Sequence, residues 1–75
     1  MSGKMEIPYL EELKLNNNNI ISIDVLENSK FQGLKLLDLK FNRINNIEIL
    51  KNVNFPELEI LNLGYNNIGD INPLR

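Results

Sequence analysis

The sequence predicts an α/β solenoid, in which short strands and short helical turns alternate along a coiled chain. Three observations support this prediction: a repeated spacing, a strand pattern within each repeat, and an asparagine that recurs where each strand should end. The spacing is 24 residues, and it is obeyed by Leu10, Leu34 and Leu58; Leu13, Leu37 and Leu61; Leu15, Leu39 and Leu63; Asn18, Asn42 and Asn66; and Ile20, Ile44 and Ile68. A strict period of this length indicates a stack of equivalent units.

Each repeat is expected to contain one short strand. Leu37 and Leu39 are two residues apart, so both side chains point to the same face of an extended chain. Asn42 follows where the chain must turn away, and a buried turn leaves backbone N–H and C=O groups without sheet partners. A side-chain amide can both donate to and accept from those groups, whereas aspartate cannot donate and leucine can do neither. We therefore predict an internal ladder formed by Asn18, Asn42 and Asn66.

The second half of each repeat should return the chain along the opposite side through a short helical turn, near residues 25–29 and 49–53. Asp24 followed by Glu27 resembles a helix N-cap with an acid three residues on. Asn72-Pro73 resembles an N-cap followed by proline at the first helical position. The side chains expected to fill the core from this half of the repeats are Leu26, Leu50, Phe31 and Phe55.

The pattern Leu-x-x-Leu-x-Leu-x-x-Asn-x-Ile, present in all three copies, resembles the leucine-rich repeat. The resemblance implies a curved, right-handed solenoid with short parallel strands on the concave face and short helices or turns on the convex face. It also implies a role in binding proteins. The ending Ile68–Leu74, "IGDINPL", is similar to the linking segment of bacterial internalin repeats, although those repeats are shorter than 24 residues.

The phase of the repeats divides the chain into leader residues 1–3 and three 24-residue repeats over 4–75, without recognisable cap sequences. When the last residues of the chain are joined to the first, "INPLR" followed by "KMEIPYL" forms a good copy of "IEILKNVNFPEL". Two explanations fit. The segment is part of a longer or designed array, or three-repeat units stack head to tail. Contacts between unlike ends either close into a ring or continue as a filament, so a homo-oligomer is one expectation.

The composition argues against several functional classes. The chain has no histidine and no cysteine, so Ser-His and Cys-His catalytic arrangements, disulfides and ordinary zinc sites are excluded. The four glycines form no phosphate-binding motif. We expect no enzyme activity, no cofactor and no metal. A net charge of −2 without a basic stripe predicts no nucleic-acid partner. No apolar run suits a signal peptide or a membrane span, and no Asn-x-Ser/Thr site occurs, so a cytoplasmic location is expected.

Strand phase identifies the positions beside the inward leucines, which should form the concave face. In the first repeat these positions are Glu12, Lys14, Asn16 and Asn17, and Gly64 belongs to the third. The residues predicted to contact a protein partner are Leu36, Asp38, Lys40, Phe41, Ile60, Asn62 and Tyr65. Adjacent strands would place Leu36 beside Ile60 and Phe41 beside Tyr65, giving an apolar and aromatic patch that resembles an interface hot spot.

Two interpretations of this patch remain open at the level of sequence. It binds a protein partner, or its side chains only cover the sheet. Lys14 beside Asp38 is expected to form an opposite-charge cross-strand pair with a structural role. The two function hypotheses are a protein-interaction scaffold and a structural unit that assembles with copies of itself.

Overall fold

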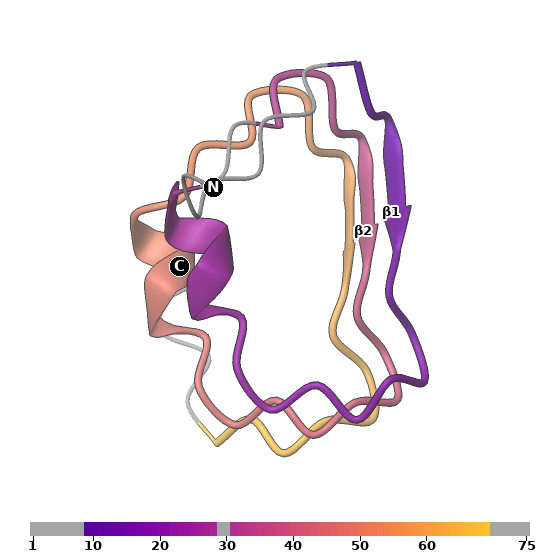
Figure 1. Ribbon diagram of the computed structural model, residues 1–75, viewed down its shortest axis with the longest axis vertical. Helices are drawn as coiled ribbons and strands as arrows, with labels where there is room; N and C mark the ends of the chain where they lie inside the picture. The colour runs from indigo at the N-terminus through magenta and orange to yellow at the C-terminus, as the bar shows by residue number, and fades with distance from the viewer. Residues whose placement is uncertain (1–8, 29–30, 70–75) are drawn as a thin grey trace.

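A computed structural model describes residues 9–28 and 31–69 of the chain. The elements, in chain order, are strand β1 (Glu12–Lys14), 3-10 helix η1 (Asp24–Asn28), strand β2 (Leu36–Asp38), 3-10 helix η2 (Glu48–Lys51) and strand β3 (Ile60–Asn62). The strands lie side by side in one parallel sheet, in the order β1-β2-β3. The helices η1 and η2 pack together across the coil from the strands (Figure 1).

The strand register follows the 24-residue period. Leu13 pairs with Leu37, and Leu37 pairs with Leu61, so equivalent residues of successive repeats stand beside one another. The parallel ladder continues beyond the strands, where the backbone N–H of Leu15 donates to the Asp38 carbonyl at 2.8 Å. Because side chains alternate across a strand, the leucine column faces the core and its neighbours face outward.

The core lies between the sheet and the helices, and its most deeply buried part is the middle repeat. The buried apolar side chains are Ile23, Leu26, Phe31, Leu34, Leu37, Leu39, Ile44 and Ile47. Leu37 is 0% exposed, whereas Leu13 and Leu61 are only partly buried. The Phe31 and Phe55 rings stack with centroids 6.1 Å apart; Phe31 lies in the core, and Phe55, which is partly buried, packs against it. Full burial of such a side chain contributes about 1.5–3 kcal/mol.

The two helical turns are present, but they start and end slightly earlier than predicted. Asp24 was expected as an N-cap, and this is wrong, because it is the first residue of η1. Ser22, two positions before the helix, provides the side-chain acceptor: its Oγ accepts a hydrogen bond from the Asp24 backbone N–H at 3.2 Å. In η2, Asn46 Oδ1 accepts from the Glu48 backbone at 2.8 Å. A single 3-10 turn leaves its first N–H groups open, and these short side chains satisfy one of them. The Asn72-Pro73 prediction lies outside the described residues.

Candidate functional site

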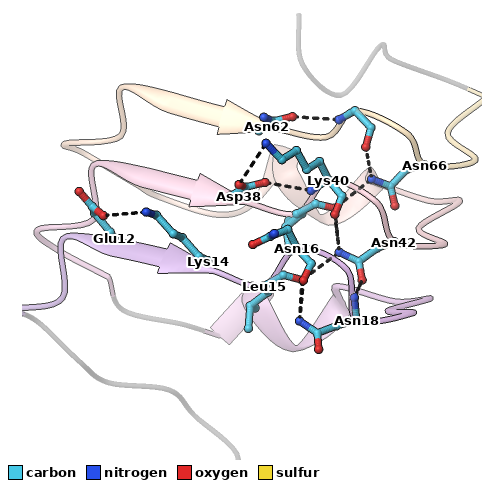
Figure 2. Close-up of polar contacts among 12 residues, drawn as sticks. Glu12, Lys14, Leu15, Asn16, Asn18, Asp38, Lys40, Asn42, Asn62 and Asn66 are labelled. Atoms are coloured by element: carbon cyan, nitrogen blue, oxygen red, sulfur yellow. Dashed lines mark hydrogen bonds and ion pairs between the residues drawn. The ribbon is translucent and has the colours of Figure 1, made fainter.

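Asn42 lies in the turn after β2 and is only 7% exposed. Its Oδ1 accepts hydrogen bonds from the backbone N–H groups of Asn18 and Ile20, both at 2.9 Å. Its Nδ2 donates to three backbone carbonyls, those of Leu15 at 3.0 Å, Leu39 at 2.8 Å and Lys40 at 3.3 Å. The amide therefore satisfies its own turn and ties that turn to the preceding repeat (Figure 2).

Asn66 makes four of the five corresponding bonds one repeat later. Its Oδ1 accepts from the Ile44 N–H at 2.9 Å, and its Nδ2 donates to the carbonyls of Leu39 at 3.0 Å, Leu63 at 3.0 Å and Gly64 at 3.2 Å. The side chain of Asn18, which is exposed, donates only within its own turn, to the carbonyls of Leu15 and Asn16. Figure 2 shows the three amides one above another beside the strand ends. We call this column the asparagine ladder.

The outward side of the strands, which we call the sheet face, carries the residues predicted to contact a partner. Leu36 pairs with Ile60 in the register, and Asp38 pairs with Asn62. Leu36 is partly buried, whereas Ile60 is 53% exposed. Asp38 Oδ1 and Asn62 Oδ1 each accept the backbone N–H two residues on, both at 3.1 Å. These two polar side chains thus support their own turns.

Phe41 and Tyr65 form a stacked pair at the ends of β2 and β3. Their ring centroids are 4.5 Å apart and their planes differ by 7°. Phe41 is 45% exposed and Tyr65 is 78% exposed. Both residues have φ of 57°, and Asn17, which is in phase with them, has φ of 61°. Asparagine tolerates positive φ, whereas bulky side chains rarely adopt it. Sequence reasoning missed this conformation, although the in-phase asparagine is a signal for it.

The charged side chains on the sheet face pair along their strands. The register does place Lys14 beside Asp38. The expected ion pair between them is nevertheless not formed: the Lys14 ammonium lies 3.6 Å from Glu12, and the Lys40 ammonium lies 3.9 Å from Asp38. Each lysine reaches the carboxylate two positions earlier in its own repeat, on the same side of the sheet (Figure 2).

A cavity of about 170 Å³ opens at the start of the strands. Its lining comes from two in-phase columns of the sheet: Glu11, Lys35 and Glu59, and Glu12, Leu36 and Ile60. Sequence reasoning placed Glu12, Leu36 and Ile60 on the sheet face but did not include Glu11, Lys35 and Glu59. Their phase immediately before the strands is the signal that could have added them.

Three further large apolar side chains are exposed outside the predicted site. They are Tyr9 at 92%, Ile21 at 58% and Val25 at 54%. Within residues 9–28 and 31–69, no group of three or more acidic, histidine or cysteine side chains is placed to hold a metal ion. No helix in the described part of the chain has the length and apolar character needed to cross a membrane.

Comparison with known proteins gives a match to a protein family. A family model described as "Leucine Rich repeats (2 copies)" matches residues 32–75, which is more than half of the chain. No curated protein and no solved structure matches the sequence. The matched segment contains β2, η2 and β3 together with Asn42 and Asn66. This chain belongs to the leucine-rich repeat family.

Proposed function

We propose that this chain is a non-enzymatic protein-interaction module whose partner binds on the sheet face. Leucine-rich repeats generally mediate protein–protein interaction, and the family is typically non-enzymatic. The anchors are the stacked pair Phe41 and Tyr65, together with Leu36 and Ile60. Aromatic side chains with apolar neighbours are enriched among the residues that dominate binding energy.

The conformation of Phe41 and Tyr65 supports this proposal most directly. The turn needs positive φ at this position, and Asn17 meets the need in the first repeat with a residue suited to it. Phe41 and Tyr65 occupy the same position with bulky rings that are 45% and 78% exposed. A left-handed backbone costs roughly 1–2 kcal/mol for an ordinary L-residue. Residues kept in a strained conformation at an exposed site point to a role in binding.

The remaining predicted contact residues have structural roles of their own. Asp38 and Asn62 accept backbone N–H groups in the turns that follow their strands. Lys40 lies within 3.9 Å of the Asp38 carboxylate. We therefore assign these three to the rim of the interface, where truncation of a side chain changes affinity little.

The proposed architecture is the right-handed solenoid of the family, with the sheet face on its concave side. In that arrangement the curvature of the stack would bring the outward side chains of neighbouring strands toward a bound partner. The in-register strands, the parallel sheet and the helices on the opposite side support it.

A displayed library of random peptides tests the binding proposal. Binders selected on the wild-type chain are measured again on the double variant Phe41→Asn/Tyr65→Asn, which restores the residue type of Asn17 at both positions. We expect these binders to lose at least tenfold in affinity. The matched control is Ile21→Asn, which removes an exposed apolar side chain elsewhere. Binders that keep their affinity for the double variant, or lose it equally for the control, would reject the sheet face.

The second candidate function is assembly with copies of the same chain through the ends of the repeat stack. Incomplete burial of Leu13 and Leu61 supports it, because a second copy stacked on either side would cover these leucines as Leu37 is covered. Such contacts join unlike surfaces, so the product is a ring or a filament. Sedimentation at rising concentration distinguishes the candidates: growing mass supports assembly, and a monomer at high micromolar concentration rejects it.

A further inference from the structure

The cavity at the start of the strands is lined by two apolar residues, which we call its apolar floor, and by charged residues with an excess of acidic ones, which we call its acidic rim. Leu36 and Ile60 are adjacent in the register and supply the apolar part. Three acidic residues, Glu11, Glu12 and Glu59, also line the cavity, together with one basic residue, Lys35. One positive charge against three negative charges leaves the lining with a formal charge of −2.

The ion pairs already present neutralise this rim only in part, because three carboxylates against the two lysines that pair with them, Lys14 and Lys35, leave a formal charge of −1. Lys35 lies 3.5 Å from Glu11, and Lys14 lies 3.6 Å from Glu12. These side chains are 51–65% exposed, and ion pairs at such exposure contribute only about 0–1 kcal/mol, so they exchange partners readily. Within the described residues, the Glu59 carboxylate has no ion-pair partner. A cation that reaches the cavity therefore meets one unpaired carboxylate and two weakly paired ones.

The size of the cavity indicates what part of a partner it can receive. About 170 Å³ corresponds to roughly six water molecules at about 30 Å³ each. Sites for drug-sized ligands are larger, at about 300–1,000 Å³. The cavity therefore fits one side chain of a bound protein, and its chemistry calls for a side chain with an apolar stem and a cationic head.

We propose that this cavity receives an arginine side chain of the bound protein. The stem lies across Leu36 and Ile60, and the guanidinium group reaches the carboxylates of Glu59 and Glu12. Long basic side chains bury their stems on apolar surface while the charged head stays at a polar rim. Arginine is preferred over lysine, because its planar group donates two parallel hydrogen bonds to a carboxylate and is less strongly hydrated. The inference rests on the proposed function and specifies the partner's chemistry at one position.

Titration of the isotope-labelled chain with N-acetyl-arginine amide, followed by amide NMR at low salt, tests the assignment. The neutral isostere N-acetyl-citrulline amide is the matched probe. We expect arginine to shift the amide signals of Leu36, Glu59 and Ile60 at least threefold more than citrulline. Added salt should reduce the difference, because exposed charges are screened.

Variants separate the acidic rim from the apolar floor. Glu59→Gln and Ile60→Thr should each reduce the arginine-induced shifts at least threefold. Glu27→Gln makes the same charge change on η1, on the opposite side of the coil, and should leave them unchanged. The spectra also report whether each variant is folded. Equal shifts with arginine and citrulline, or equal effects of Glu59→Gln and Glu27→Gln, would overturn the assignment.

Failure of the cavity assignment can be distinguished from failure of the proposed function. If the arginine titration fails while Phe41→Asn/Tyr65→Asn still abolishes peptide binding, only the cavity assignment falls. If the titration succeeds while the double variant binds every selected peptide normally, the assignment of the cavity to arginine is kept, and the role of Phe41 and Tyr65 as binding anchors is rejected. The selected peptides give a second readout: they should be enriched in arginine, and Glu59→Gln should weaken the arginine-containing ones selectively.

Discussion

The rings of Phe41 and Tyr65 stack almost parallel, with centroids 4.5 Å apart, although each residue has φ of 57°. Stacking of this kind contributes about 0.5–1.5 kcal/mol beyond the burial of area. The positive φ costs each residue roughly 1–2 kcal/mol. Stacking therefore does not by itself repay the strain, and the backbone of the turn must hold both residues in place. One backbone hydrogen bond that helps to hold Phe41 in place runs from its N–H to the Gly64 carbonyl, at 3.0 Å.

Substitution at Phe41 should follow the tolerance of each residue type for positive φ. Phe41→Asn should change the free energy of unfolding by less than about 1 kcal/mol, because asparagine relieves strain while the stack is lost. Phe41→Val should be less stable than Phe41→Asn by about 1–2 kcal/mol, because a branched Cβ is poorly tolerated there. Urea unfolding of the two variants measures the difference. Equal stability would show that the turn adapts its backbone to the side chain.

The asparagine ladder should be most sensitive to substitution in its middle. Asn42→Ala removes five hydrogen bonds and leaves buried backbone N–H and C=O groups without partners. Each buried group left without a partner costs about 1–3 kcal/mol. The free energy of unfolding should fall by about 3 kcal/mol or more. Asn18→Ala is the matched control, because the Asn18 side chain is exposed and bonds only within its own turn. Its cost should stay near 1 kcal/mol. Similar costs at both positions would contradict the ladder.

Asn42→Asp should destabilise the chain in a pH-dependent way. An ionised carboxylate can still accept from Asn18 and Ile20, but its other oxygen meets the carbonyls that received the amide N–H bonds. This contact disfavours the charged form and raises the pKa of the introduced carboxyl above its value in the unfolded chain. A raised pKa stabilises the fold at acidic pH, and this stabilisation is lost as pH rises through the folded pKa. Unfolding of variant and wild type at pH 7 and pH 4 should show a smaller deficit at pH 4. An identical deficit at both values would refute the donor role of the amide.

Substitutions of the inward leucines should destabilise the fold more where the leucine is more deeply buried. Leu37→Ala should cost about 2–5 kcal/mol, because Leu37 is fully buried between two neighbouring repeats. Leu13→Ala should cost about half as much, since Leu13 is only partly buried. Thermal or urea unfolding of both variants gives the comparison. A larger loss at Leu13 would place the centre of the core elsewhere.

The period of 24 residues was enough to predict the strand register. Because equivalent residues stand side by side in a stack, Leu37 had to neighbour Leu13 and Leu61, and Leu36 had to neighbour Ile60. The face each residue occupies follows from alternation along a strand. Which residues are neighbours across the sheet, and which face of the sheet each side chain occupies, could therefore be derived from residue numbers alone.

The side-chain detail could not be derived in the same way. Lys14 has carboxylates at similar reach along and across the sheet, and the choice of Glu12 over Asp38 depends on rotamers. A helical turn of one 3-10 repeat carries little sequence signal, so the role of Ser22 in place of Asp24 was missed. The cavity also needs Glu11, Lys35 and Glu59, whose 24-residue spacing makes them neighbours but does not indicate that the surface is hollowed beside them.

The free energy of unfolding of Phe41→Asn/Tyr65→Asn tests most directly whether the aromatic pair serves binding rather than folding. Two relieved φ values should offset the lost stack and the lost burial of the rings, leaving the double variant within about 1 kcal/mol of the wild type. A loss of more than about 2 kcal/mol would show that Phe41 and Tyr65 are held in place by the fold they stabilise, and would contradict the account.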